Sequence, residues 1–456
     1  MANKNKLANG AKISQIQLNY YAPAAVVPPQ IDIPLGTTYC FLSKVDPWPD
    51  ENDPPAPALD QKSLKKIFKS MFVAKLVTSS DISPVVQRVD WTSGITYDYY
   101  RDDIDMFELD QNGNLVYHFY VKNKYDQVFK CLWNNNGAPS TLEPYFEPGT
   151  YTTNNIFKGS DGYKWKFMYT IDTGLKVKFM DKSWIPVPVG ANTPNPLISS
   201  AGAGSIDVIN VLDTGSGYDP ANAVVYVSIT GDGSGALASA NIAANGIIQD
   251  IIVTNPGTNY TYADIQIVSQ LGSGANVVGP TSPVGGHSFD PLSELGCSHA
   301  MYTVEFNGSE NGLIPTDIDF HQLGLITTPT ALDVNPYPAS ESIYSTTTDF
   351  VMAPGADTGY LRDETIYQGS VDNPTFFGTV LSFDVATNVA KVLNITGTPT
   401  TNGPIFGQSS KTTRTLLSYT SPNFVNLSGY IAFIENRTGI QRSADGIEQF
   451  KFVIGY

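Results

Sequence analysis

Gly429-Tyr-Ile-Ala-Phe-Ile434, Glu435-Asn-Arg-Thr-Gly-Ile440 and Ile447-Glu-Gln-Phe-Lys-Phe-Val-Ile454 are the three runs that decide the fold of this chain. In the last run, Phe450 and Phe452 recur at the two-residue period of a strand with one buried face. The first run is continuous and apolar, as expected of a strand covered on both faces. A polar connection with the turn dipeptide Asp445-Gly446 separates them. We therefore expect both strands to pair with segments far back in the sequence.

The composition is that of a β-rich globular protein. Hydrophobic residues make up 41% of the 456 residues and aromatic residues 11%, whereas charged residues reach only 15%, below the usual quarter. The 39 Gly and 31 Pro indicate many turns between short strands. We predict a mainly β (α+β) fold with a β-sandwich core, one or two short amphipathic helices and two small inserted β domains.

Charge and targeting features restrict the partners. A net charge of −16 argues against a nucleic-acid partner, which requires a basic surface. The first ten residues contain no apolar signal-peptide core, and no run is long enough to span a membrane, so we expect no membrane insertion. Cys40, Cys131 and Cys297 are odd in number and far apart, which favours reduced thiols in a cytoplasm.

The N-terminal half alternates strands with loops. A strand over residues 37–44 leads into Asp46-Pro-Trp-Pro-Asp50 and a Pro-rich loop to residue 57, which is either solvated or an arm laid on a neighbouring subunit. An amphipathic helix follows, with apolar residues from Leu64 to Phe72 at helical spacing. Its opposite side carries four lysines, either a solvated face or a docking surface for an acidic partner: Lys62, Lys65, Lys66 and Lys69.

Two further β elements are predicted before residue 175. Asn112-Gly113 lies between two alternating runs, Met106 to Leu109 and Leu115 to Tyr120, which is typical of a hairpin. In the later strand, aromatic residues alternate with lysines and other residues from Tyr163 to Ile171. Such a row either stacks nucleic-acid bases or packs a core, and the acidic charge favours the core.

Residues 204 to about 280 contain an internal duplication with a period of about forty residues. Gly215-Ser-Gly-Tyr218 recurs as Gly257-Thr-Asn-Tyr260, and Gly233-Ser-Gly-Ala236 recurs as Gly272-Ser-Gly-Ala275. No helix pattern and no Gly-Lys-Ser/Thr follow these turns, so they are not phosphate-binding loops. A second β-module, a small barrel or sandwich, is expected between about 345 and 418. Between the modules, Asp290-Pro291 is expected to start a short helix.

Several stretches, taken in order, resemble the small dimeric wedge subunit of the baseplates of T-even-like contractile-tailed bacteriophages. They are Asp46-Pro47-Trp48, the amphipathic helix with its following strand, Arg88-Val-Asp90-Trp91, Asp161-Gly-Tyr163-Lys-Trp165, Ile185-Pro-Val-Pro188 and the C-terminal strand with Glu435-Asn436-Arg437. The resemblance covers roughly residues 11–200, 285–335 and 425–456. A departure occurs at His321, where the family pattern has a basic residue.

The resemblance implies a division of the chain and a role. Core would occupy 1–200, 284–340 and 421–456, with a glycine-rich repeat module inserted at 201–283 and a small barrel or sandwich at 341–420. The implied protein is a virion structural subunit, a homodimer assembled in the host bacterial cytoplasm. It would bind the large elongated wedge scaffold and the fibre-bearing peripheral subunit and transmit baseplate rearrangement during infection. The candidate structural or interaction residues are Trp48, Trp91, Tyr163, Trp165, Glu435, Asn436 and Arg437.

Enzyme and metal chemistry have little support in the sequence. His287, Cys297 and His299 lie close together, but they lack a fourth ligand at a zinc-finger spacing and show no oriented nucleophile–base pairing. We therefore predict no catalytic residues, no metal and no cofactor. Two alternatives remain, namely a virion β-protein whose 350–418 module binds a host surface glycan, and a tail-associated polysaccharide enzyme with paired carboxylates.

Overall fold

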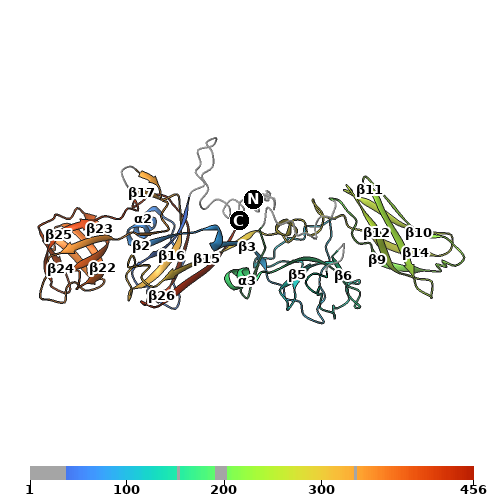
Figure 1. The fold of residues 1–456 in the computed structure, drawn as a ribbon, viewed down its shortest axis with the longest axis horizontal. Helices are drawn as coiled ribbons and strands as arrows, with labels where there is room; N and C mark the ends of the chain where they lie inside the picture. The colour runs from blue at the N-terminus through green and yellow to red at the C-terminus, as the bar shows by residue number, and fades with distance from the viewer. Residues whose placement is uncertain (1–36, 151–154, 190–202, 333–335) are drawn as a thin grey trace. The chain divides into compact units, whose positions relative to one another are not determined.

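The computed structural model describes residues 37–150, 155–189, 203–332 and 336–456. The first ten residues, and positions 11–36 and 190–200 of the family match, lie outside these ranges. The described chain is mainly β with few, short helices, as predicted. It forms two compact units (Figure 1). Within the described ranges, one contains Ser83–Met301 with Val453–Tyr456, and the other contains residues 37–82 with Tyr302–Phe452.

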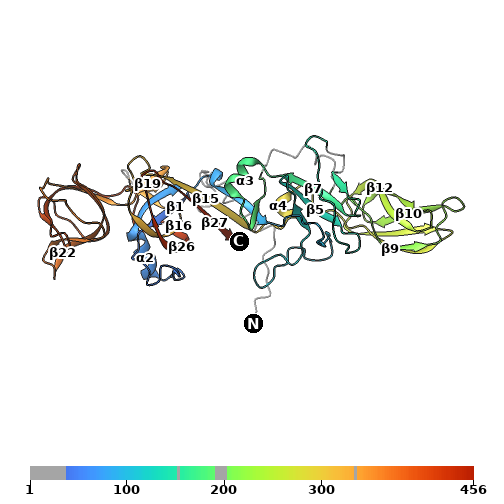
Figure 2. The ribbon, with the colours of Figure 1, turned by 90° about the horizontal axis from the view of Figure 1, so that it is seen from below.

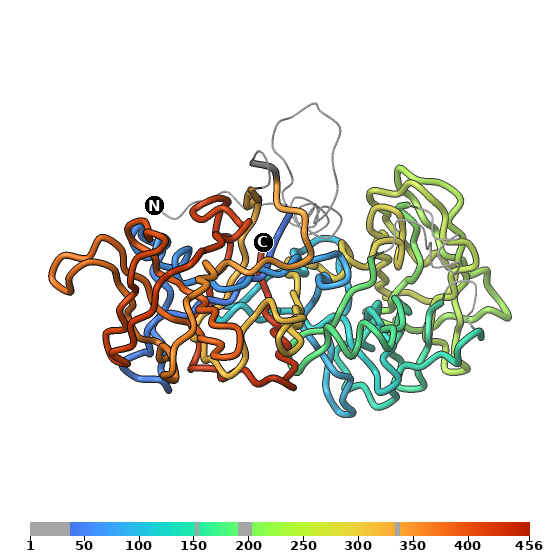
Figure 3. The backbone as a smooth tube through the Cα atoms, turned by 60° about the vertical axis from the view of Figure 1, so that its left-hand side comes forward, coloured from blue at the N-terminus to red at the C-terminus, as the bar shows by residue number. Residues whose placement is uncertain are grey.

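A five-stranded antiparallel sheet organises the unit that holds Tyr302–Phe452. Figure 3 shows the blue N-terminal strands running among the orange and red strands of the C-terminal third. Leu325 pairs with Phe433, which is the predicted long-range pairing of the closing segment. The strands in spatial order are β19 (Ile343–Ser345), β2 (Met71–Leu76), β1 (Thr38–Ser43), β16 (Asp319–Thr327) and β26 (Tyr430–Gln441).

The closing strands differ from the prediction in two respects. β26 lies at the edge of the sheet and Tyr430 is 76% exposed, so the expectation of a strand covered on both faces is wrong. The segment Glu435–Ile440, expected to connect two strands, is part of β26, because its backbone continues to pair with β16 as far as Gln441. Within the apolar run Tyr430–Ile434, Phe433 packs inside the unit. Its ring stacks on that of Phe452 of β27 (Ile447–Gly455), with ring centroids 4.9 Å apart.

The amphipathic helix is present as α2 (Gln61–Ser70). The Asp60 carboxylate caps it by accepting hydrogen bonds from the N–H groups of residues 62 and 63. The helix ends two residues earlier than the apolar periodicity predicted, because Met71 takes an extended conformation and starts β2. Met71 and Phe72 are buried as strand residues. The apolar spacing continued by coincidence across a change of secondary structure.

A closed six-stranded barrel forms the C-terminal module of the same unit, and Figure 2 shows it nearly end-on. Closure leaves no unpaired sheet edge. Its interior is filled by apolar residues such as Phe350, Ile366, Phe376 and Ile405. The strands in spatial order are β20 (Thr348–Met352), β23 (Val389–Gly397), β22 (Pro374–Asp384), β21 (Thr365–Gly369), β24 (Pro404–Gly407) and β25 (Thr413–Thr420).

The unit that holds Ser83–Met301 contains a four-stranded sheet, in the order β4 (Tyr120–Lys122), β5 (Gln127–Trp133), β7 (Lys164–Thr170) and β6 (Ile156–Lys158). The predicted hairpin around Asn112-Gly113 is present only in a reduced form without two regular strands: the N–H of Val116 donates to the carbonyl of Glu108, and the N–H of Asp110 donates to that of Asn114. Residues 109 and 115 form one isolated bridge, because the Asp110 carboxylate accepts the N–H groups of Asn112 and Asn114 and forms a local turn. Smaller elements of this unit are β3 (Ile82–Gln87), α3 (Thr173–Phe179), β8 (Trp184–Pro186) and α4 (Pro291–Glu294).

The glycine-rich module consists of three two-stranded sheets around an apolar core. Its two copies contact each other reciprocally. The Tyr218 hydroxyl accepts the N–H of Ala275 at 3.1 Å, and the Tyr260 hydroxyl accepts that of Ala236 at 3.4 Å. The strand pairs are β9 (Asn210–Ser216) with β14 (Ser273–Val278), β10 (Val225–Gly231) with β13 (Ala263–Ser269), and β11 (Ser234–Ile242) with β12 (Ile248–Thr258).

Candidate functional site

The Pro-rich loop lies on the exposed edge of β26. The Trp48 indole N–H donates to the carbonyl of Arg437 at 2.7 Å, and the Asn436 amide donates to the carbonyl of Pro55 at 2.8 Å. We call this junction, loop 46–57 with Asn436–Gly439, the edge clamp. It satisfies polar groups that an edge strand would otherwise present to other chains. The loop is therefore held on its own chain by these two contacts, although most of its residues are exposed, and its contact with a neighbouring subunit stays a prediction.

Glu51 is the charged centre of the edge clamp. Its carboxylate accepts the N–H of Gly439 at 2.9 Å and that of Trp48 at 2.7 Å, and it lies 3.1 Å from the His321 imidazole. The Gly439 N–H is the main reason that the pKa of Glu51 is lowered, and the Trp48 N–H and His321 add to the effect. His321, a departure from the family pattern, thus has a role in holding the loop.

The remaining sequence-predicted residues of the C-terminal motif lie beside these contacts. The guanidinium of Arg437 pairs with the Glu435 carboxylate at 2.8 Å, and the amide of Gln322 on β16 donates to Asn436 at 2.7 Å. The structure therefore brings Trp48 together with Glu435, Asn436 and Arg437. Their side chains and backbone groups connect the loop 46–57, the edge strand β26 and the neighbouring strand β16.

Trp91, Tyr163 and Trp165 come together in the other unit as part of an aromatic core. The Tyr163 and Trp165 rings are nearly parallel, at 15° and 5.4 Å between centroids. The Tyr163 hydroxyl donates to the carbonyl of Ala138, and the Trp91 indole donates to Ser140. Burial raises the pKa of Tyr163 to about 12. The alternating aromatic row therefore packs a core, as predicted, and its faces are not available to stack bases.

The other face of that sheet carries charged groups that sequence reasoning did not find. Lys130 is 0% exposed, and its ammonium lies 3.1 Å from the Glu294 carboxylate and 3.2 Å from His287. The Tyr100 ring lies 3.9 Å from the same ammonium. We call Lys130, His287 and Glu294 the buried charge cluster.

Protonation in the buried charge cluster is set by burial and by mutual charge. Burial lowers the pKa of Lys130, and it also lowers that of His287, with a further contribution from the Lys130 charge. Burial alone would raise the pKa of Glu294, but Lys130 and His287 lower it overall. The geometry and the directions of these shifts favour an ammonium–carboxylate pair with a neutral imidazole at its side.

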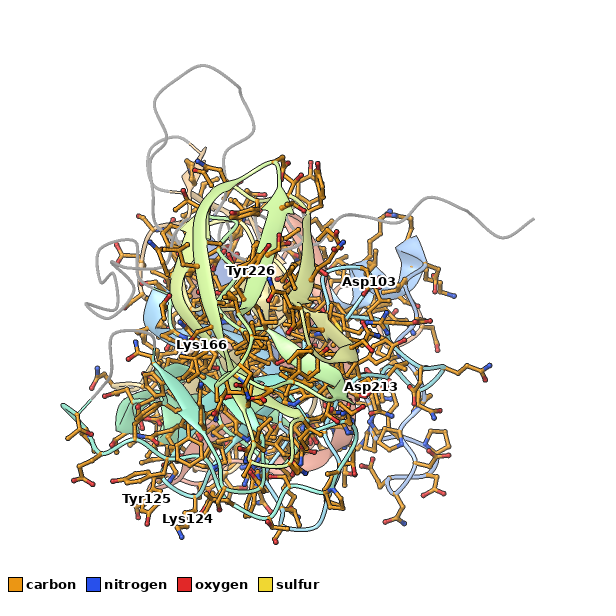
Figure 4. The ribbon with its side chains drawn as sticks, turned by 90° about the vertical axis from the view of Figure 1, so that its right-hand side faces the viewer. Asp103, Lys124, Tyr125, Lys166, Asp213 and Tyr226 are labelled. Atoms are coloured by element: carbon orange, nitrogen blue, oxygen red, sulfur yellow. The ribbon has the colours of Figure 1, made fainter. Side chains whose placement is uncertain are left out.

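Two more buried lysines lie on β7, and one of them connects the sheet to the glycine-rich module. The Lys164 ammonium contacts the Asp250 carboxylate at 2.8 Å and the carbonyl of Ile209 at 3.2 Å. Burial lowers the pKa of Lys166, and the negative charges of Asp207 and Glu294 oppose that shift. Figure 4 labels Lys166 among the strands and Lys124 at the edge of the view.

The three residues considered for metal binding do not form a site. His287 belongs to the buried charge cluster, the Cys297 thiol donates to the carbonyl of Val85, and the His299 imidazole contacts Ser298. Burial raises the pKa of Cys297 to about 12, which makes it a poor nucleophile. Among the residues that the structure describes, no group of three or more His, Cys, Asp or Glu side chains is placed to hold a metal ion.

A cavity of about 320 Å³ lies between α2, β23 and the segment after β25. Its lining is mainly apolar and includes Phe68, Met71, Leu393 and Phe424, with Lys69 as its one titratable side chain. This lining provides no acid–base pair for catalysis. No helix within the described ranges is long and apolar enough to cross a membrane.

The chain matches no known protein-family model, and no curated protein sequence matches it. The family resemblance therefore depends on the motifs quoted above and stays a prediction.

Proposed function

We propose that this protein is a structural subunit of a contractile-tail baseplate wedge, in an extended form with two inserted β-modules. In this role it is a homodimer that joins the large elongated wedge scaffold to the fibre-bearing peripheral subunit. It would transmit baseplate rearrangement during infection, and its place is the virion tail. The role requires stable surfaces and no turnover.

The observation that carries this proposal is the edge clamp. Trp48 and Arg437 belong to two family-like motifs separated by nearly the whole described chain, and a 2.7 Å hydrogen bond joins them. Motifs inherited from one fold are expected to meet in this way, because each keeps its position through contacts with the others. Chance matches would meet only as often as any two segments of the same compact unit do.

The glycine-rich module supports a further part of the proposal, namely additional contacts within the wedge. It exposes several large apolar side chains, including Tyr226, Leu237 and Tyr262, each more than half exposed. Aromatic side chains of this kind are enriched at protein interfaces. Deleting the module is not a clean test, because the deletion would leave the buried Lys164 without Asp250.

The first experiment is light scattering on the purified full chain, followed by mixing with the wedge scaffold protein encoded by the same virus. A dimer that forms a stable complex with the scaffold supports the proposal. A monomer that fails to bind the scaffold would overturn it. A monomer that binds would retain the wedge role but remove the implied dimer.

Two tyrosines provide a matched test of the module. Tyr226 on β10 is 52% exposed and Tyr125, before β5, is 51% exposed; Figure 4 labels both. We expect Tyr226→Ser to weaken scaffold binding while Tyr125→Ser leaves it unchanged. Equal effects of the two substitutions would show that the module makes no specific contact.

A further inference from the structure

The barrel displays a row of three aromatic side chains on its outer surface. Phe377 of β22 is the cross-strand partner of Tyr367 of β21, and Tyr367 is the partner of Phe406 of β24. Directly paired residues project to the same face of a sheet. Their sequence neighbours Ile366, Phe376 and Ile405 fill the barrel interior, so the row faces outward.

The row is partly exposed and extends across three strands. Phe377 is 39% exposed, and Tyr367 and Phe406 are half-buried. The Tyr367 and Phe406 rings are stacked, with centroids 5.5 Å apart and planes within 27°. Adjacent strands are about 4.8 Å apart, and the row therefore spans about 10 Å, which is enough for two consecutive sugar rings.

Hydroxyl groups border the row at both ends, and one of them, on Thr396, accepts a hydrogen bond from the Lys69 ammonium of α2 at 3.3 Å. Thr396 pairs with Phe377 at one end, and Thr413 pairs with Phe406 at the other. The three aromatic-bearing segments 365–369, 374–383 and 404–407 contain no Asp, Glu, Lys or Arg. The whole stretch 348–420 has six acidic and four basic residues, so it has no excess of positive charge to attract a polyanion.

We propose that this row, Phe377, Tyr367 and Phe406, is a binding platform for a neutral glycan chain. The faces of aromatic rings carry partial negative charge and attract the C–H bonds of a sugar ring, while flanking threonine hydroxyls match the sugar hydroxyls. Outer faces of small β-barrels bind oligosaccharides in other folds. The three segments contain no cation and Lys69 lies at one end of the row only, whereas single-stranded nucleic acid, which also stacks on aromatic rows, needs a groove of cations.

The platform goes beyond the wedge role and is independent of it. A structural subunit needs no sugar contact, and the three residues of the row lie outside the edge clamp. Failure of scaffold binding would leave the platform intact, and failure of glycan binding would leave the wedge role intact. The two proposals therefore have separate outcomes.

The test is binding of the full chain to a printed array of neutral and acidic bacterial oligosaccharides, followed by titration with the best neutral one. We expect Phe377→Ala and Tyr367→Ala each to weaken that binding about tenfold. The control is Leu417→Ala, because Leu417 is a 48% exposed apolar residue of β25 outside the row. It should leave the affinity unchanged, and circular dichroism should show all three variants folded.

Three results would overturn the proposal. The first is no neutral oligosaccharide bound on the array. The second is binding confined to acidic oligosaccharides or to single-stranded nucleic acid. The third is neutral-glycan binding that Phe377→Ala and Tyr367→Ala reduce no more than Leu417→Ala does.

Discussion

The buried charge cluster predicts a specific loss of stability when one partner is removed. Lys130 is 0% exposed and the side chain of Glu294 is 1% exposed, with 3.1 Å between ammonium and carboxylate. Lys130→Met leaves an uncompensated buried carboxylate, and Glu294→Gln leaves an uncompensated buried ammonium. Both substitutions nearly preserve side-chain length, so their main effect is on charge.

The magnitude follows from the distance. Two unit charges 3.1 Å apart attract by about 5 kcal/mol at an effective dielectric constant of about 20. Removal of one partner of a buried pair costs about 3–5 kcal/mol. We therefore expect each single variant to lose about 3–5 kcal/mol of unfolding free energy. The double variant, which buries no unpaired charge from this pair, should lose less than the sum of the two.

His287 adds a pH dependence to the Lys130→Met variant. In the native protein, burial and the Lys130 charge lower the pKa of His287, whereas Glu294 raises it. Without the ammonium, one of the two causes that lower the folded-state pKa of His287 is gone, so this pKa is higher in the variant than in the native protein. A lowered histidine pKa destabilises the folded state below the unfolded pKa of about 6.5, and this acid-side destabilisation is smaller in the variant. The loss should therefore be larger at about pH 8 than at about pH 5.5.

The assay is urea unfolding of the full chain followed by tryptophan fluorescence, for the native protein and the three variants at both pH values. Tryptophans 133 and 165 lie on the two central strands of the affected sheet and report its unfolding. Single variants that lose less than about 1 kcal/mol, the range of exposed pairs, would refute the reasoning. A double variant equal to the sum of the singles would do the same, because it would show no coupling between the two charges.

Three further changes test other parts of the structure. Gly233→Ala should destabilise the glycine-rich module by about 1–3 kcal/mol, measured by thermal unfolding, because the added Cβ would lie 2.4 Å from the Tyr260 ring. Trp48→Phe should lower stability by about 1 kcal/mol and raise the rate of proteolysis in loop 46–57, because it removes the hydrogen bond to Arg437. The pKa of Glu51 is lowered in the folded protein, so its contacts stabilise the fold above the ordinary pKa of about 4.3, and this stabilisation is lost as pH falls through the lowered pKa. We expect the loss to change the fluorescence of Trp48, and Glu51→Gln should abolish this acid-dependent change.

The periodicity of apolar residues predicted those helices and strands that are determined by residues close together in the sequence. The helix before β2 was predicted from apolar spacing, and the structure adds Asp60 as its cap; the short helix at residue 291 was predicted from Asp290-Pro291. The alternation around Trp165 identified the aromatic face of β7. In each case the information lies within about ten residues, which is the range over which helix and strand periods operate.

Edge position and the ends of elements were not predictable in this way. Tyr430–Ile434 reads as a doubly covered strand, yet a strand's place in a sheet depends on which segments pair beside it. Here the outer neighbour of β26 is an irregular loop held by Glu51 and Trp48, and a sequence pattern for strands does not detect it. The Glu435-Asn436-Arg437 motif was predicted as an interaction site. Its contacts with Trp48 and Pro55, nearly four hundred positions earlier, are visible only in the structure.

The buried lysines show why charge is the hardest property to place from sequence. The alternation around Trp165 puts Lys164 and Lys166 on the second face of β7, and a lysine in a strand is ordinarily solvated. The Asp250 carboxylate pairs with Lys164, and the negative charges of Asp207 and Glu294 oppose the effect of burial on Lys166. The glycine-rich module is thus energetically part of the unit that contains it, because its removal would leave the buried Lys164 ammonium without its carboxylate.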